Sequence, residues 1–150
     1  MLMISLFLSL ILSLSPPHCS QREKMQQEFH VLETTGQIKR FLKTYEGTNC
    51  EDIKPYLFTA HMLLAKHAFW PHQKINHFTF GKEQLEEFIK KNPQHLEAKY
   101  LRMLVQRKCP SFLKYNENLF QDRDYVLEHL KNSSLSSDYK KTILKNTELL

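Results

Sequence analysis

Histidine side chains are concentrated in the middle of this chain, and they are the residues best suited to chemistry. The candidate ligands of a zinc or copper site, for which imidazole is a common donor, are His61, His67, His72 and His77. Six and five residues separate the first three, whereas a separation of four would align two ligands on one helix face. No Asp or Glu lies between His61 and Gly81 to complete a ligand shell. We therefore expect no metal and no other cofactor, with a His-dependent metal-binding protein or metalloenzyme as the alternative.

The same segment carries four aromatic residues that suit either a binding surface or the core. They are Phe69, Trp70, Phe78 and Phe80. Aromatic residues are enriched where proteins bind one another, so these four, with His72 and His77, are the candidate binding residues. The more common outcome is that such residues fill the core beside a helix connection. In that case Trp70 is the one expected to be partly exposed, because its ring N–H needs a polar edge.

The cysteines beyond residue 20 are Cys50 and Cys109. They either form a disulfide, which export of the protein would permit, or remain two separate buried thiols. A disulfide that closes a loop of this length is worth about 4 kcal/mol in the chain-entropy model. Cys109 is a poor candidate nucleophile, because it follows a predicted helix whose terminal carbonyl dipoles disfavour a thiolate.

Acidic residues form no recognisable catalytic pair. The pair Glu86-Glu87 and the run Asp122-Arg123-Asp124 are neighbouring charges on predicted helix faces, which is typical of solvated surface. The sequence contains no glycine-rich phosphate loop, no Gly-x-Ser-x-Gly and no His-Glu-x-x-His. We therefore expect a protein that is not an enzyme.

The elements that carry these residues are predicted to be helices. Only three glycines occur, and no Val-Ile-Thr alternation typical of strands is present. We expect a single all-α domain of five or six helices, with residues 22–33 either extending the first helix or forming an arm. The predicted ranges are 36–45, 52–69, 74–91, 94–108, 116–131 and 137–147. Thr34 and Gln37 resemble a capping box, and residues 94–108 are apolar on enough of their surface to be central.

A tight helix junction at Asn92-Pro93 suggests an architecture. Proline ends the preceding helix and suits the opening turn of the next, so the two helices must fold back on each other. The surrounding residues 81–101 resemble the junction between two tetratricopeptide-type repeats. Gly81 stands at the small-residue slot where paired helices touch, and Leu85 and Leu101 stand at apolar slots.

Two residues depart from the tetratricopeptide pattern, since Phe88 and Arg102 occupy slots that are usually small. The resemblance implies TPR-like antiparallel helical hairpins, whose grooves bind proteins or peptides. The chain beyond the leader, above all segments 64–71 and 112–116, is also similar to small uncharacterised exported proteins of Bacteroidetes-type bacteria. This second resemblance implies a location in the bacterial envelope and no particular activity.

The first twenty residues resemble a secretory signal. Residues 1–14 are uncharged and mostly large aliphatics, too short a run for a membrane span of ~20 residues, and a helix-breaking segment follows. No Lys or Arg precedes this run, and the cleavage site is unclear. We expect a signal peptide at residues 1–20, a single helical domain at 21–150, and a periplasmic or extracellular location.

The charge of the chain does not favour nucleic acid as a partner. The net charge of +5 comes from 21 basic and 16 acidic residues, which are interspersed as on solvated helix faces. We expect a protein or peptide partner, no nucleic acid, and membrane contact only through an uncleaved leader. Binding of anionic lipid or nucleic acid through the basic excess would require the Lys and Arg residues to share one face.

Overall fold

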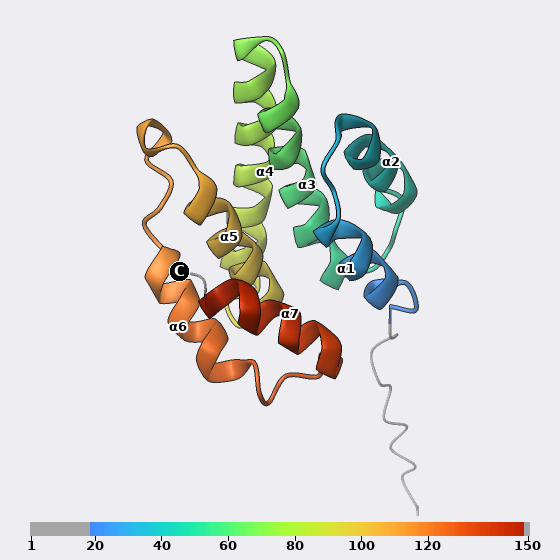
Figure 1. The fold of residues 1–150 in the computed structure, drawn as a ribbon, viewed down its shortest axis with the longest axis vertical. Coiled ribbons are helices and arrows are strands. Elements are labelled where there is room, and N and C mark those ends of the chain that lie inside the picture. The colour runs from blue at the N-terminus through green and yellow to red at the C-terminus, as the bar shows by residue number, and fades with distance from the viewer. Residues whose placement is uncertain (1–18, 149–150) are drawn as a thin grey trace, which may run out of the picture.

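The computed structural model describes residues 19–148, and this part of the chain is all-α (Figure 1). It contains seven α-helices, two short 3-10 helices and no strand. The α-helices are α1 (Arg22–His30), α2 (Thr35–Tyr45), α3 (Lys54–His67), α4 (Pro71–Lys91), α5 (Leu96–Lys108), α6 (Leu119–His129) and α7 (Ser137–Glu148); the 3-10 helices are η1 (Glu51–Ile53) and η2 (Ser111–Leu113). The all-α prediction is confirmed. The helix number exceeds the expected five or six because residues 22–30 form a helix of their own.

The helices pack mostly against their neighbours in the chain, with α3 and α5 in the middle (Figure 1). Helix α3 contacts α1, α2, α4 and α5, and α7 lies across the lower end of the molecule. The central place predicted for residues 94–108 is confirmed, because Tyr100, Leu101 and Met103 of α5 have no exposed surface. They share one hydrophobic cluster with Tyr56 and Ala60 of α3, which are equally buried.

Helices α3 and α4 form a close antiparallel hairpin around Gly81. A Cβ atom at Gly81 would collide with the carbonyl oxygen of Phe58 and lie 2.6 Å from Cγ of Met62. The expectation of a small residue at this helix contact is therefore confirmed. The hairpin turns over three residues, and α4 begins at Pro71 rather than at the expected Lys74. Proline suits the first helical position, where its missing N–H costs nothing.

Capping residues in the sequence determine where helices α2 and α5 begin. The capping box at Thr34 is confirmed: its hydroxyl accepts from the Gln37 N–H at 3.3 Å, and its own N–H donates to Oε1 of Gln37 at 2.9 Å. Helix α5 begins at Leu96, later than expected, because His95 caps it by accepting from the Ala98 N–H at 3.1 Å. Pro93 thus lies in the connection between α4 and α5.

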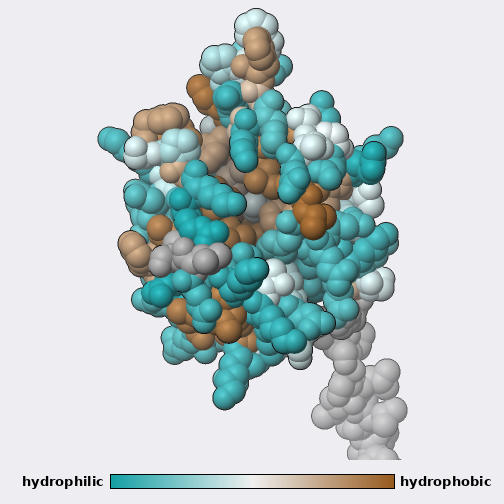
Figure 2. All heavy atoms as spheres, viewed as in Figure 1, coloured by the Kyte–Doolittle hydropathy of each residue, from teal (hydrophilic) through white to brown (hydrophobic). Residues whose placement is uncertain are grey.

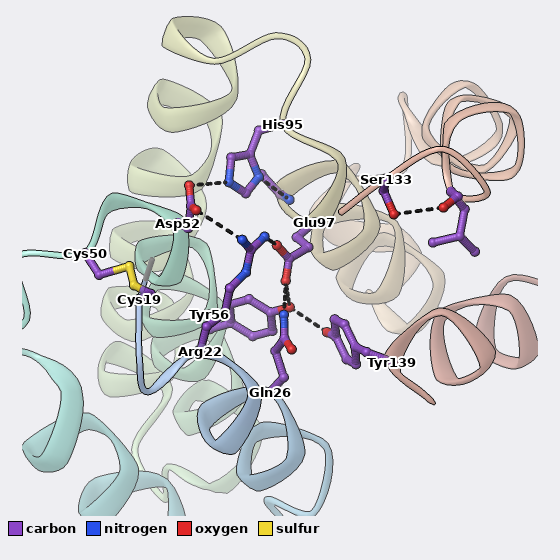
Figure 3. Close-up of polar contacts among 12 residues, drawn as sticks. Cys19, Arg22, Gln26, Cys50, Asp52, Tyr56, His95, Glu97, Ser133 and Tyr139 are labelled. Carbon is purple, nitrogen blue, oxygen red and sulfur yellow. Dashed lines mark hydrogen bonds and ion pairs between the residues drawn. A yellow bond between two sulfur atoms is a disulfide. The ribbon is translucent and has the colours of Figure 1, made fainter. Parts of the chain in front are cut away.

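The disulfide joins Cys19 to Cys50, so both alternatives considered for Cys50, a bond to Cys109 and a separate thiol, are wrong (Figure 3). It ties the residue ahead of α1 to the residue ahead of η1, with the two Cα atoms 6.0 Å apart. Cys109 ends α5 as a free thiol. The prediction failed because it assigned Cys19 to the leader. Except for Cys19 and Ser20, the proposed signal segment lies outside the described residues. Within residues 19–148 no helix has the length and apolarity needed to cross a membrane.

Candidate functional site

The predicted aromatic residues Phe69 and Trp70 lie at the turn between α3 and α4, the end of the hairpin that projects from the molecule (Figure 1). The Phe69 side chain is 82% exposed and Trp70 is 55% exposed. Their rings meet edge to face at 5.0 Å, and the His72 ring stacks near the indole at 6.5 Å. We call Phe69, Trp70 and His72 the aromatic tip. The expected partial exposure of Trp70 is confirmed, whereas the interpretation of Phe69 as a core residue is wrong.

The other predicted residues lie lower on the hairpin and on different sides of it. Phe80 is about half exposed, and its ring lies 4.8 Å from that of His61. The His61 ring also lies 3.5 Å from a carboxylate oxygen of Glu46. Burial lowers the pKa of His61, the Glu46 carboxylate opposes this shift, and His77 adds to it. His61, His77 and Phe80 therefore form one small group, separate from the aromatic tip.

The four candidate metal ligands do not come together. Across residues 19–148 no three His, Cys, Asp or Glu side chains are grouped so that they could hold a metal ion. His61 and His77 are neighbours, whereas His72 stacks on Trp70 at the aromatic tip. His67 lies at the end of α3 and lines the groove described next. The structure thus offers no metal centre built from His61, His67, His72 and His77.

An open groove of about 1360 Å³ lies between the α3–α4 hairpin and helix α5. The end of α1 and one side of α7 close it, and the segment around η2 forms part of its rim. Figure 2 shows brown side chains in a hollow of this face, bordered by teal ones. The apolar lining includes Phe29, Leu63, Ile75, Phe78, Leu104, Val105 and Phe112. The groove is therefore an apolar channel with a polar margin.

Positive charge dominates the margin of this groove. The charged residues that line it are Lys66, Lys74, Arg107, Lys108, Lys145 and a single acid, Glu33. The Arg107 guanidinium is held in place because it donates to the backbone oxygen of Asn146 at 2.7 Å. Of the predicted binding residues, Phe78 lines the groove, with its ring edge-on to Tyr115 at 5.8 Å. An amphipathic segment with acidic side chains would complement such a surface.

A buried charge cluster fixes the wall formed by α4 and α5. Arg102 donates to Asp122 at 2.6 and 2.8 Å and to Glu86 at 2.7 Å, and the Tyr115 hydroxyl donates to Glu86 at 2.5 Å. Burial lowers the pKa of Arg102, but its bonds and charge contacts with Asp122 outweigh this and raise it. Asp122 is fully buried, so its expected place on the solvated surface was wrong.

A second buried network, which was not predicted from the sequence, centres on Glu97 (Figure 3). The Glu97 carboxylate is 1% exposed and accepts hydrogen bonds from Arg22, Gln26 and Tyr56. Tyr56 is also linked to the Tyr139 hydroxyl at 2.5 Å. Burial and the Glu97 charge raise the pKa of Tyr56 well above its usual value, so its hydroxyl stays protonated.

The Glu97 network holds together helices that are distant in the sequence. It connects α1 and α7 to α3 and α5, and it therefore positions the two groove walls that α1 and α7 supply. One sequence signal could have revealed it: Glu97 is three and four residues from Tyr100 and Leu101 and so shares their buried face. An acid in that position needs buried donors.

The arrangement as a whole combines two buried polar clusters with one open groove. In the Glu97 cluster and in the Arg102 cluster, the polar side chains form hydrogen bonds with other members of the same cluster. Each cluster in this way ties several helices together. The groove, by contrast, presents apolar and cationic side chains to solvent. Comparisons with known protein families, with curated proteins and with solved structures found no match for this chain.

Proposed function

We propose that this protein is a non-enzymatic binding module whose groove receives a segment of another protein or a peptide. The observation that carries the proposal is the groove itself, an apolar channel with five Lys or Arg side chains and one acid along it. Burial of apolar side chains would supply most of the binding free energy. The charges would select an acidic guest and speed its approach.

The helical-hairpin architecture supports this function. Helices α3, α4 and α5 run antiparallel in succession (Figure 1), and the small residue Gly81 permits the close contact within the first pair. These features support the proposed likeness to tetratricopeptide-type repeats, which use a concave helical surface to hold extended or helical peptides. The guest we propose is an amphipathic segment that places Leu, Ile or Phe in the channel and Asp or Glu at its margin.

The disulfide supports the proposed export to the cell envelope. Disulfides persist in oxidising compartments such as the periplasm and the cell surface, and they are rare in the cytosol. Cys19 belongs to the bond, so a leader cut after Ser20 would remove one of its two cysteines. We therefore place the cut ahead of Cys19 if the leader is removed.

Selection of peptides from a random display library against the purified chain tests the proposal. We expect the enriched peptides to combine acidic and large apolar residues. Lys145→Glu, on the α7 wall of the groove, should weaken the best peptide roughly tenfold, since it reverses a charge beside the guest. The matched control is Lys141→Glu, one turn away on α7, where the exposed Lys141 contacts Asp138 outside the groove.

A second pair of variants tests the apolar channel. Ile75→Ser removes an apolar side chain that lines the groove, and Leu127→Ser removes one of the exposed apolar side chains on α6, which does not line it. Only the first should weaken the selected peptide. Failure of the library to yield binders, or equal loss in the groove and control variants, would overturn the proposal.

A further inference from the structure

The aromatic tip is not explained by the groove. Phe69, Trp70 and His72 are not among the residues that line it, although His67 and Pro71 on either side are. Their rings contact one another, and Phe69 and Trp70 remain largely exposed. They stand on the projecting turn of the hairpin, outside the groove lining (Figure 1). Exposed aromatic residues gathered in this way mark an interaction site.

A further exposed aromatic residue, Phe112, lies on a second loop at the same end of the molecule. Phe112 is 78% exposed and belongs to η2, in the loop that follows α5. This loop and the end of the α3–α4 hairpin border the same groove, and both point toward the top of Figure 1. Two separate projections with exposed aromatic rings therefore share one end.

Positive charge accompanies both projections. Residues 53–82 contain no Asp or Glu, and Lys66 and Lys74 each stand four residues from Trp70. Residues 98–116 also contain no Asp or Glu, and Lys108 and Lys114 each stand close to Phe112 in the sequence. Lys66, Lys74 and Lys108 line the groove that both projections border, so positive charge lies beside both sets of exposed rings.

We propose that this end of the protein docks on a membrane surface rich in anionic phospholipid. Trp and Phe residues prefer the interfacial zone of a bilayer, where a ring is buried and its polar edge stays wet. Lys side chains beside them extend toward headgroup phosphates. A lipid surface is favoured over a protein partner because it is deformable and accepts two separate convex projections at once. This contact does not need the leader, and its aromatic tip lies outside the groove lining, although Lys66, Lys74 and Phe112 belong to both surfaces.

The single tryptophan makes the proposal directly measurable, since Trp70 is the only one in the chain. Its emission is recorded with vesicles of phosphatidylcholine alone and with an equimolar mixture of phosphatidylcholine and phosphatidylglycerol. The proposal expects a shift to shorter wavelength and protection from iodide quenching with the anionic vesicles alone. High salt should reverse both changes, because it screens the contact with headgroups.

Variants separate the tip from the rest of the surface. Phe69→Ser should reduce partitioning into anionic vesicles at least tenfold. The double variant Lys66→Gln, Lys74→Gln should reduce it roughly 25-fold, at about fivefold for each charge near the surface. The matched control is Phe120→Ser: Phe120 is 68% exposed on α6, outside both projections, and its loss should leave partitioning unchanged.

Three results would overturn the proposal. They are an unchanged Trp70 emission with anionic vesicles, equal partitioning into neutral and anionic vesicles, and equal effects of Phe69→Ser and Phe120→Ser. A Trp70 shift caused by an acidic peptide and abolished by Phe69→Ser would instead assign the tip to a protein partner. Phe69→Ser should leave peptide binding in the groove intact, so failure of this proposal and failure of the groove proposal are distinguishable.

Discussion

The guanidinium of Arg22 on α1 and the carboxylate of Glu97 on α5 form an ion pair in the interior, 75 residues apart in the chain. Gln26 and Tyr56 donate to the same carboxylate, at 2.5 Å for Gln26. Burial lowers the pKa of Arg22, and the Glu97 charge and hydrogen bond outweigh this and raise it. Because the network also reaches Tyr139 on α7, it decides where the two end helices stand relative to the groove.

Replacing Glu97 should strongly destabilise the fold. Glu97→Ala leaves three buried or half-buried donors without their acceptor, and breaking a buried charge pair in this way costs about 3 to 5 kcal/mol. The loss is measured as the free energy of unfolding in urea. Glu87→Ala is the control, because Glu87 and Lys91 form an exposed pair at 3.2 Å that contributes less than about 0.5 kcal/mol. Equal losses in the two variants would contradict the account of the network.

Loss of the disulfide should destabilise the oxidised protein. Cys19 and Cys50 are separated by 31 residues, and a loop of that size corresponds to about 3.5 kcal/mol in the chain-entropy model. Cys50→Ser is therefore expected to lower the free energy of unfolding by about that amount, whereas Cys109→Ser should change it little. Alkylation of the unfolded, unreduced chain should modify one cysteine, Cys109; modification of Cys50 would refute the pairing.

The His30 side chain should make stability fall in weakly acidic solution. Burial lowers the pKa of His30 to about 4 from its ordinary value of 6.5, and its ring lies 3.2 Å from the Tyr139 hydroxyl. Between these two pH values the unfolded chain binds more protons at this site than the folded one, so stability decreases as pH falls below about 6.5. The expected loss from pH 7 to pH 5 is about 2 kcal/mol.

Urea unfolding at both pH values measures the His30 contribution. His30→Gln cannot take up the proton and should remove about 2 kcal/mol of the pH dependence. The exposed His129 serves as the control position, and His129→Gln should retain the behaviour of the wild type. An unaltered pH dependence in His30→Gln would show that other groups cause the loss.

Two glycine substitutions should have opposite effects. Gly81→Ala places a methyl group against the Phe58 carbonyl and Met62, which must separate α3 from α4, so we expect a loss of about 1 to 3 kcal/mol. Gly36→Ala meets no atom within 4 Å inside helix α2 and should gain about 0.5 to 1 kcal/mol from helix propensity. Thermal unfolding distinguishes the two; a neutral Gly81→Ala would contradict the close helix contact.

Features encoded by neighbouring residues were predictable from the sequence. The capping box at Thr34 and the helix class follow from local spacing, and the small residue at Gly81 was placed by the likeness to a repeat junction. The tightness of that contact is confirmed by the position of Met62. Such features depend on a few residues close in the chain, whose geometry the helix itself determines.

Features that need distant partners were not predictable. From the sequence alone, Asp122 is one more acid on a helix face, because nothing shows that Arg102 packs beside it. Glu97 likewise has no visible partner, because Arg22 reaches it only through the packing of α1. The disulfide was not predicted for a different reason: the assignment of residues 1–20 to a leader excluded Cys19 from pairing. The groove likewise forms only when α1 and α7 pack beside it. The sequence therefore indicated Phe78 as a binding residue but not the groove that Phe78 lines.

The most direct test of the groove proposal compares two labelled peptides of equal length and helical pattern by fluorescence anisotropy. Both place Leu and Phe on one face, and the polar face carries Asp and Glu in one peptide and Lys and Arg in the other. The account predicts at least tenfold tighter binding of the acidic peptide, reduced about tenfold by Lys145→Glu and unchanged by Lys141→Glu. Equal affinity for the two peptides, or equal effects of the two substitutions, would contradict it.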